Sequence, residues 1–372
     1  LTNMVLAMYH LADLRALQGQ LPEAQALYEE AVELAVDRQG RRQPIAGVAL
    51  MGLGRLLLQR NDLEGATRLL LEGIELIKRW GEVGALSGYI GLARVMQAQG
   101  DAEGARRAMQ AAEQLAIKFD AMKADDIMVA MYQVRLWLAQ GDLEAAARWV
   151  EERGLERGIS RGELESEAHG ALLPLLRLYE YVTLAQVYVA QSRPDEALSV
   201  LAHLQRLVED GGWTTLLIQV LILQALAFDA RDDVARAMVA LGRALSLAEA
   251  GGFVRVFVDE GEPMARLLRQ AATRGIALKY VSGLLAAFDA SEYGRVGETP
   301  PHPSAQLLIE PLTERELEVL RLLVTHLSST EIAEGLIISA NTVRSHIKSI
   351  YSKLNVHSRA DAVQRARELK LL

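Results

Sequence analysis

The 372-residue chain contains no cysteine, few aromatic residues and no long apolar run. The absence of cysteine excludes a disulfide framework and cysteine-ligated zinc, and it is compatible with a reducing cytoplasm. No apolar run approaches the ~18 residues of a membrane-spanning helix, so we expect no membrane segment. Because aromatic residues make up only 5% of the chain whereas Ala and Leu are abundant, an all-α fold is the first expectation.

Sequence signals of catalysis and of cofactor binding are also absent. The seven histidines show no His-x-x-x-His spacing, which disfavours a metalloenzyme. No Gly-x-x-x-x-Gly-Lys-Ser/Thr phosphate loop occurs. The neighbouring acids Asp259 and Glu260 lie beside a Gly-Glu-Pro turn, where solvated turn and N-cap residues are more common than catalytic ones. We therefore expect no enzymatic activity, no metal and no cofactor in this chain.

Charge is distributed unevenly along the chain. The net charge of −8 argues against a uniformly basic nucleic-acid-binding protein. Residues 311–372, however, contain nine Lys and Arg residues against seven Asp and Glu residues. Within residues 340–354, Arg344, Lys348 and Lys353 are accompanied by no acidic residue. A local basic face on an otherwise acidic chain is typical of one docking surface for phosphate.

A repeat of about 40 residues runs through residues 1–250. Each copy has a short turn segment that ends in alanine, with apolar residues at helical spacing on both sides. Four close copies and two weaker ones begin at Gly19, Asn61, Gly100, Gly141, Ser192 and Ala230. Their final alanines follow one another at intervals of 42, 39, 41, 51 and 38 residues.

The pattern predicts one helical hairpin per repeat. Gly or Asn-Asp forms the turn, Asp or an early Pro begins the second helix, and the small alanine allows close approach of the two helices. One hairpin cannot bury its apolar stripe alone, so hairpins stack into a superhelix that resembles tetratricopeptide repeats. Its concave surface can bind a peptide, a protein or a small ligand. Tyr89, Trp137 and Trp149 are expected to be packing residues, and no ligand contact can be assigned.

The regular pattern is interrupted twice. The interval of 51 residues predicts an insertion between residues 154 and 173, with a surface loop over residues 151–162. Alternation of Val254, Val256 and Val258 indicates a short strand or an extended link.

Composition and pattern together predict four segments. Two helices are expected at 264–273 and 278–288, followed by a stretch rich in Pro and Gly. The resulting division is a helical-repeat sensor or interaction domain at 1–250, its C-terminal cap at 251–290, a flexible linker at 291–309 and a small domain at 310–372.

The small domain carries four helix-start signals, which are Thr313 with Glu316, Ser328 with Glu331, Ser339 alone, and Ser358 with Asp361. Helical apolar spacing follows each signal. Ala333 is small where the second and third helices are expected to cross. The predicted core of the domain consists of Leu317, Leu320, Ile332, Leu336, Val343, Ile347, Ile350 and Leu354.

The third helix of this domain has the profile of a helix that enters the DNA major groove. Its outer face carries cations and small polar groups, and Arg and Lys can donate to guanine O6 and N7. The residues predicted to contact base edges are Arg344, Ser345 and Lys348. The residues predicted to contact the DNA backbone are Thr313, Ser339, Asn341, Thr342, Lys353 and Arg359. His346 lies near the inner side of the helix and is expected to be a packed structural residue.

These segments also carry a family resemblance. The matching residues are 312–320, 331–339, Thr342, Val343, His346, Lys353, Leu354, Val356 and Arg359. Over about 60 residues they closely resemble the LuxR-type helix-turn-helix domain. The resemblance implies base contacts by the residues matching Arg344, Ser345 and Lys348, and homodimers on inverted DNA repeats through a fourth helix at 358–368. Arg344 stands where the family usually has Lys, and His326 stands where Gly is usual.

The repeats followed by this domain resemble the large MalT-like ATP-dependent regulators. In those proteins an ATP-binding module precedes the repeats, and the repeats bind an inducer. The chain begins with the pattern of the middle of a helix, so we expect a fragment of a longer protein in which ATP belongs to the missing module. The predicted partners are double-stranded DNA, RNA polymerase, and an unknown inducer or protein on the repeats.

The function predicted from the sequence is a sequence-specific, cytoplasmic transcription regulator of bacteria. One rival class is a helical-repeat scaffold without a DNA-regulatory role, which predicts no affinity for DNA. A two-component response regulator shares the DNA-binding domain, but it would need an α/β receiver where residues 1–250 have a helical pattern. The inducer, the operator and the direction of regulation are not predicted.

Overall fold

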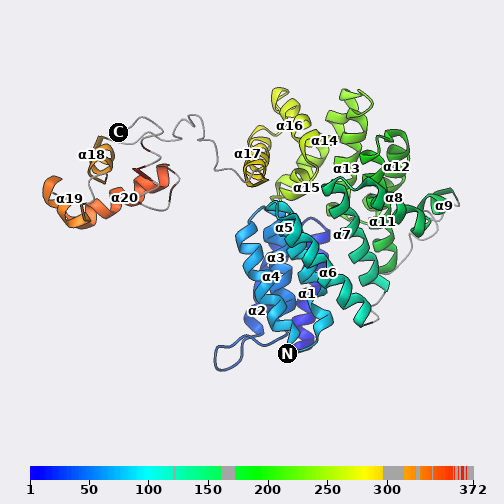
Figure 1. The fold of residues 1–372 in the computed structure, drawn as a ribbon, viewed down its shortest axis with the longest axis horizontal. Helices are drawn as coiled ribbons and strands as arrows, with labels where there is room; N and C mark the ends of the chain where they lie inside the picture. The colour runs from blue at the N-terminus through cyan, green and yellow to red at the C-terminus, as the bar shows by residue number, and fades with distance from the viewer. Residues whose placement is uncertain are drawn as a thin grey trace. The chain divides into compact units, whose positions relative to one another are not determined.

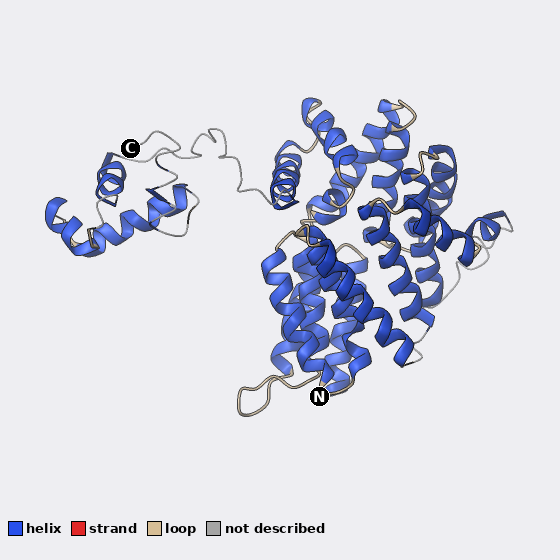
Figure 2. Ribbon diagram, in the orientation of Figure 1, coloured by secondary structure: helices blue, strands red, loops and turns tan. Residues whose placement is uncertain are grey.

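The computed structural model describes residues 1–119, 123–160, 172–295, 314–323, 327–336 and 338–354, with residues 356, 359, 362, 363 and 366. Within this part of the chain the elements are helices, and no strand occurs beyond an isolated bridge between Val36 and Arg42 (Figure 2). The expected all-α fold is confirmed. The chain separates into two compact units, Leu1–Val296 and Gly297–Leu372, and each is described by itself.

The described residues of the first unit form six helical hairpins that stack in chain order (Figure 1). The first helices of the hairpins are α1 (Thr2–Leu17), α3 (Ala46–Gln59), α5 (Leu86–Ala98), α7 (Lys123–Gln140), α11 (Leu172–Ala190) and α13 (Thr214–Asp229). The second helices are α2 (Leu21–Leu34), α4 (Leu63–Lys78), α6 (Ala102–Lys118), α8 (Leu143–Arg153), α12 (Pro194–Asp210) and α14 (Val234–Glu249). A short 3₁₀ helix, η1 (Glu82–Ala85), precedes α5. The predicted superhelix of hairpins is therefore confirmed.

Every hairpin turn contains one residue in the left-handed backbone region. These residues are Gly19, Asn61, Gly100, Gly141, Ser192 and Asp232, with φ between 57° and 82°. Gly adopts this conformation without steric cost, and Asn and Asp tolerate it better than other residues. The next residue donates its N–H to the carbonyl five residues earlier, for example Gln20 to Arg15 at 2.9 Å. The turn thus satisfies carbonyls at the end of each first helix.

The second helix of a hairpin begins directly after this turn. Asp62, Asp101, Asp142 and Asp233 accept hydrogen bonds from the backbone N–H three residues further on, at 2.8–3.1 Å. Pro stands at the start of α2 and α12 instead. Each second helix then places a fully buried alanine against the first helix, at Ala24, Ala66, Ala105, Ala146, Ala197 and Ala237.

The sixth repeat corrects the register predicted from the sequence. The prediction began this repeat at Ala230 and ended it at Ala235. The left-handed residue is Asp232, the N-cap is Asp233, and the buried alanine is Ala237, whereas Ala235 is exposed. Without a glycine in this turn, the sequence does not show which of several small and acidic residues occupies the left-handed position.

Two further predictions about the interruptions are wrong. The segment 151–162 is not a loop over its described length, because α8 continues to Arg153 and α9 (Leu155–Ser160) follows a left-handed Gly154. Leu155 is 1% exposed, so burial of this side chain holds α9 in place. The alternating valines form neither a strand nor a link, since α15 (Arg255–Val258) is helical. Phe253 and Phe257, four residues apart, are buried on one side of this turn.

The helices predicted near residues 264–273 and 278–288 are confirmed as α16 (Glu262–Thr273) and α17 (Leu278–Arg295). Helix α17 continues into the segment predicted as a linker. The remainder of that segment lies outside the described residues, and the domain boundaries at 250, 290 and 309 stay predictions. Trp149 is buried, and Tyr89 and Trp137 are partly buried and pack against the core, as expected for packing residues.

The superhelix closes on itself where the last hairpin meets the first. Helix α13 packs against α1, and α15 packs against α3. The Thr215 hydroxyl donates to the Ala16 carbonyl at 2.6 Å, and the Val254 N–H donates to the Gln59 carbonyl at 2.8 Å. These bonds join residues about 200 positions apart in the sequence. The first helices of the hairpins consequently surround a shared interior.

The second unit contains α18 (Glu314–Leu323), α19 (Ser329–Leu336) and α20 (Ala340–Leu354) around a small core. Leu320, Ile332, Val343 and Ile350 are buried as predicted, and Leu317, Leu336 and Ile347 are partly buried. The side chain of Leu354 lies outside the description. The sequence prediction missed Val319, Leu323, Ala362 and Ala366, which are also buried. In the described part of the chain, no helix combines the length and the apolar character needed to cross a membrane.

The corrected register of the sixth repeat can be tested with two alanines on α14. Ala237→Leu should lower the free energy of unfolding by about 1–3 kcal/mol, because a larger side chain is forced between packed helices. Ala235→Leu, on the exposed face of the same helix, should change it by less than about 0.5 kcal/mol. Thermal or urea unfolding of the two variants measures the difference. Equal effects of the two substitutions would show that the register is wrong.

Candidate functional site

The candidate DNA-binding surface is built on α20. Val343 and Ile350 on its inner face are 0% exposed, and they pack with residues of α18 and α19. Ala333, 5% exposed on α19, is small at the crossing as predicted. The Ser349 hydroxyl also donates to a carboxylate oxygen of the buried Glu316 at 2.6 Å, which ties α20 to α18. The rotation of α20 about its axis is therefore fixed by both apolar and polar contacts.

The two helices of the helix-turn-helix begin with the predicted caps. Ser328 and Glu331 form a reciprocal capping box, in which each backbone N–H donates to the side chain of the other residue. The hydrogen bonds from Ser328 hold the pKa of the Glu331 carboxyl below its ordinary value. The Thr342 N–H donates to the Ser339 hydroxyl at 3.1 Å and begins α20. Glu316 was predicted to pair with Thr313, which lies outside the described residues.

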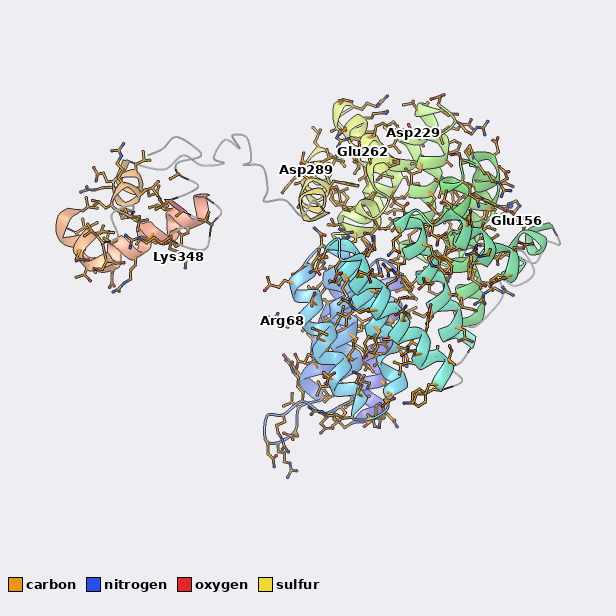
Figure 3. All side chains as sticks on the ribbon, in the orientation of Figure 1. Arg68, Glu156, Asp229, Glu262, Asp289 and Lys348 are labelled. Carbon is orange, nitrogen blue, oxygen red and sulfur yellow. The ribbon has the colours of Figure 1, made fainter. Side chains whose placement is uncertain are left out.

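The outer face of α20 carries the residues predicted to read DNA. Asn341, Thr342, Arg344, Ser345 and Lys348 are all exposed, and Figure 3 labels Lys348 on this helix. The Arg344 guanidinium donates to the Asn341 side-chain carbonyl at 2.8 Å, one helical turn away. His346 is half-buried. Five of the nine residues predicted to contact DNA thus lie exposed along one helix.

The other four predicted contacts have different outcomes. Ser339 lies at the N-terminus of α20, where its hydroxyl serves as the cap. Thr313 and the side chain of Lys353 lie outside the described residues, as does His326. The Arg359 guanidinium donates to the carbonyls of Leu323 and Leu327 at 2.9 and 2.6 Å, so it ties the end of α18 to Leu327. The geometry gives Arg359 a role within the domain, and its contact with DNA stays a prediction.

This arrangement provides the chemistry of a groove-binding helix. The 15 residues of α20 extend about 22 Å at 1.5 Å per residue, and one α-helix fits the major groove of B-form DNA. Arg344 and Lys348 supply donors for guanine, and the exposed N–H groups and hydroxyls at the helix start suit a phosphate. In the described part of α20 no acidic side chain opposes the polyanion.

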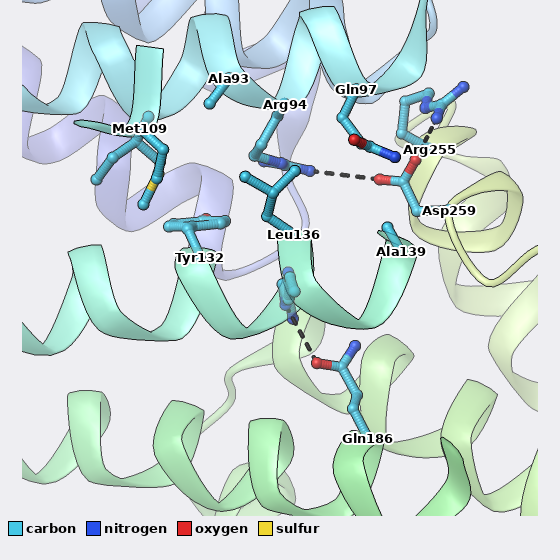
Figure 4. Close-up of a pocket in the computed structure, with 12 residues that line it drawn as sticks. Ala93, Arg94, Gln97, Met109, Tyr132, Leu136, Ala139, Gln186, Arg255 and Asp259 are labelled. Carbon is cyan, nitrogen blue, oxygen red and sulfur yellow. Dashed lines mark hydrogen bonds and ion pairs between the residues drawn. The ribbon is translucent and has the colours of Figure 1, made fainter. Parts of the chain in front are cut away.

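A second candidate site lies inside the repeat unit (Figure 4). The pocket has a volume of about 100 Å³ and is partly open to solvent, and side chains of α5, α6, α7, α11 and α15 line it together with Asp259. Apolar groups such as Ile90 and Leu136 form part of the wall. The polar wall consists of Arg94, Gln97, Tyr132, Arg135, Gln186, Arg255 and Asp259.

Guanidinium groups dominate the polar wall. Arg255, whose side chain is 4% exposed, donates to Asp259, and Arg94 lies 3.9 Å from the same carboxylate. Arg94 and Arg135 both lie over the Tyr132 ring, at 5.4 and 5.7 Å from its centroid. Burial acts to raise the pKa of the Tyr132 hydroxyl, but these guanidinium groups hold that pKa below its ordinary value. At this hydroxyl the guanidinium groups therefore outweigh the effect of burial.

The sequence analysis assigned no ligand contact to this pocket, although the alignment of the repeats contains a signal for it. The residue six positions before each left-handed turn residue faces the interior. In the first five repeats it is polar, namely Asp13, Arg55, Arg94, Arg135 and Gln186. Neighbouring members interact, since Arg55 pairs with Asp13 at 2.7 Å and Arg135 donates to Gln186 at 3.2 Å. Aligning the repeats on their turns would have revealed this row of polar residues.

The sequence interpretation of Glu260 was wrong. It was expected to be a solvated turn residue, but it is partly buried beside the pocket, where Gln186 donates to it at 3.3 Å. Burial raises the pKa of the Glu260 carboxyl to about 7, Asp259 acts in the same direction, and Arg135 opposes the shift. Asp259 fits the expectation better, because it is exposed and paired with arginines.

The two units together define a class of protein. One unit is a closed superhelix of helical hairpins with a polar interior, and the other is a capped helix-turn-helix with an exposed basic helix face. This combination characterises helical-repeat proteins with a helix-turn-helix module.

Comparison with known families agrees with this class and makes it specific. Residues 1–274 match the family described as "MalT-like TPR region", and residues 310–366 match the family "Bacterial regulatory proteins, luxR family". Because the first match spans most of the chain, the chain belongs to the MalT-like family. The resemblance stated from the sequence is confirmed in both parts.

Proteins named "HTH-type transcriptional regulator MalT" from Yersinia enterocolitica and Yersinia pestis are similar along nearly the whole chain. Each is 27% identical over 379 aligned residues, which cover 98% of this chain. The chain spans 40% of the length of these relatives.

Glu260 makes the stability of the repeat unit depend on pH. Its folded-state pKa of about 7 lies above the unfolded value, so the folded state holds the proton more tightly and stability falls as the pH rises from about 4.5 to 7. The Glu260→Gln variant has no such loss of stability with rising pH. The free energy of unfolding of this variant, relative to that of the parent chain, should therefore rise by up to about 3 kcal/mol between pH 5 and 8. Thermal unfolding across this range, with the exposed Glu30→Gln as control, measures it. Parallel pH profiles of Glu260→Gln and the parent would contradict the assignment.

Proposed function

We propose that this chain provides the sensing and DNA-binding parts of a bacterial transcription regulator. The observation that carries the proposal is the outer face of α20, where Asn341, Arg344, Ser345 and Lys348 are exposed on a helix fixed by its buried face. The luxR-family match of residues 310–366 and the named regulators among the relatives support it.

In this proposal α20 enters the major groove and the remaining contacts orient it. Arg344, Ser345 and Lys348 contact base edges, and Ser339, Asn341 and Thr342 contact the phosphates at the helix start. Thr313, Lys353 and Arg359 are further phosphate contacts predicted from the sequence. Arg344 can donate to guanine through two parallel hydrogen bonds, which a Lys at the same position cannot do. Two copies of the domain bind an inverted repeat as a homodimer.

The repeat unit is proposed to sense an inducer or a partner protein. Its closed interior contains a partly open pocket with a polar wall, and convergent polar groups of this kind suit a specific ligand. Ligand binding would be coupled to DNA binding through the full-length regulator, in which ATP binds to a separate module and RNA polymerase is contacted at the promoter. Such a regulator acts in the cytoplasm, and this chain performs no enzymatic reaction itself.

The base contact of Arg344 can be tested on genomic fragments that the chain selects from random bacterial DNA. Arg344→Ala should weaken binding to the selected site by about 1–3 kcal/mol and relax the preference at one base pair, because a bidentate guanine contact is lost. Arg344→Lys should retain part of the affinity. The matched control is Arg315→Ala on α18, an exposed arginine paired with Glu318, which should bind like the parent.

The same titrations, repeated at several salt concentrations, separate sequence-specific DNA binding from non-specific electrostatic binding. The logarithm of the binding constant should fall with the logarithm of the salt concentration, with a slope of roughly −0.9 per phosphate neutralised. An Arg344→Ala chain that keeps full affinity and full sequence preference would exclude the base contact. A parent chain that selects no DNA would favour the scaffold alternative.

A further inference from the structure

The pocket of the repeat unit contains more positive than negative charge. Arg55, Arg94, Arg135 and Arg255 reach the interior, and the facing carboxylates are Asp13, Asp259 and Glu260. Arg55 is paired with Asp13, and Arg255 is paired with Asp259. Glu260, with its pKa raised to about 7 by burial, contributes only part of a charge near neutral pH. The carboxylates of the pocket therefore do not fully neutralise the charges of Arg94 and Arg135.

Arg135 shows this imbalance most directly. Its Nε donates to the Gln186 carbonyl oxygen at 3.2 Å, and its Nη2 donates to the Gln219 carbonyl oxygen at 2.9 Å. Within the described residues its hydrogen bonds thus go to neutral amides and to no carboxylate. Two amides orient a guanidinium without neutralising it, which leaves its charge for a ligand.

The neighbouring groups complete a binding site. Arg94 is held over the Tyr132 ring and lies 3.9 Å from Asp259, a distance too long for a hydrogen bond. Oε1 of Gln97 is buried and accepts no hydrogen bond within the described residues. In Figure 4 Arg94, Gln97 and Asp259 extend toward one another from α5 and from the segment after α15. A ligand with an anionic end and a hydroxyl group would satisfy both the arginines and this amide.

We propose that Arg94 and Arg135 bind the oxyanion group, a carboxylate or a phosphate, of a small hydroxylated metabolite in this pocket. This inference rests on the proposed sensing role of the repeat unit and names the chemical class of the inducer. Fork-shaped guanidinium groups match the geometry of both oxyanions. The apolar wall formed by Ile90, Ala93 and Leu136 lowers the local dielectric constant around the ion pairs, which strengthens them.

The test compares three molecules of the same carbon skeleton with the purified chain. Gluconate presents a carboxylate, glucose 6-phosphate presents a phosphate, and glucose presents neither. At constant ionic strength, at least one anion should raise the melting temperature by about 4 °C or more at a concentration near 100 times its Kd, whereas glucose should not. The two anions then show which oxyanion the pocket prefers.

Variants assign the effect to the pocket. Arg135→Gln should weaken anion binding by about 10- to 100-fold in calorimetric titrations, and Arg135→Lys, which keeps the charge, should weaken it less. Arg106→Gln, which removes an exposed arginine on α6, is the matched control and should bind like the parent. Helical circular dichroism establishes that each variant is folded, and Arg135→Lys carries the test if Arg135→Gln does not fold.

Three results would overturn the inference. They are no stabilisation by gluconate, glucose 6-phosphate or inorganic phosphate, equal binding of glucose and its phosphate, and unchanged anion binding by Arg135→Gln. DNA binding is measured in parallel on the selected fragments. A chain that binds DNA but no anion refutes only this inference, whereas a chain that binds the anion but no DNA refutes the regulator proposal.

Discussion

The repeat unit depends on the seam at which its sixth hairpin and α15 meet the first two hairpins. Hydrogen bonds from Thr215 to the Ala16 carbonyl and from Val254 to the Gln59 carbonyl cross this seam, and Arg60 lies 3.4 Å from the Gly251 carbonyl. An open solenoid is stabilised only by contacts between neighbouring repeats. Closure adds contacts between residues about 200 positions apart and covers the apolar face that a terminal hairpin would otherwise expose.

Closure also determines what the interior can do. Arg94 comes from the third hairpin and Arg135 from the fourth, whereas Arg255 and Asp259 follow the sixth. These groups share one pocket only because the chain returns to its start. The row of polar residues six positions before each turn would face solvent in an open superhelix, and in the closed one it lies in a partly dehydrated space. Burial in this space raises the pKa of Glu260, whereas the neighbouring Arg94 and Arg135 lower the pKa of Tyr132 against the effect of burial.

Much of the fold follows from local sequence. The turn glycines, the Asp caps and the buried alanines mark the hairpins because each residue type is required by its backbone or packing position. The predictions failed where tertiary contacts determine the secondary structure of a segment. Burial of Leu155 makes a helix of a segment rich in charge and glycine, and burial of Phe253 and Phe257 makes a helix of alternating valines. The closed seam and the position of Glu260 could not be predicted, because they depend on the sum of small rotations between repeats.

In the candidate sites, too, some features follow from local sequence and others depend on tertiary contacts. The exposed face of α20 follows from helical spacing, since one buried stripe fixes which residues point outward. The hydrogen bonds of Arg359 to Leu323 and Leu327 could not be predicted from residue spacing, because the accepting main-chain carbonyls are distant in the sequence. In the repeat unit the polar row was visible, but only the structure shows that its members surround one pocket.

The closed seam can be tested directly because the chain has no cysteine of its own. A side chain added at Gly19 would place its Cβ 3.1 Å from the Cβ of Thr214, whereas one added at Gly141 would have no atom within 4 Å. Both glycines have φ near 80°, so Gly141 is a matched control for backbone strain. Under mild oxidation, Gly19→Cys with Thr214→Cys should form an intramolecular disulfide, and Gly141→Cys with Thr214→Cys should not. Failure of the first pair to cross-link, or equal cross-linking of both pairs, would contradict closure of the superhelix.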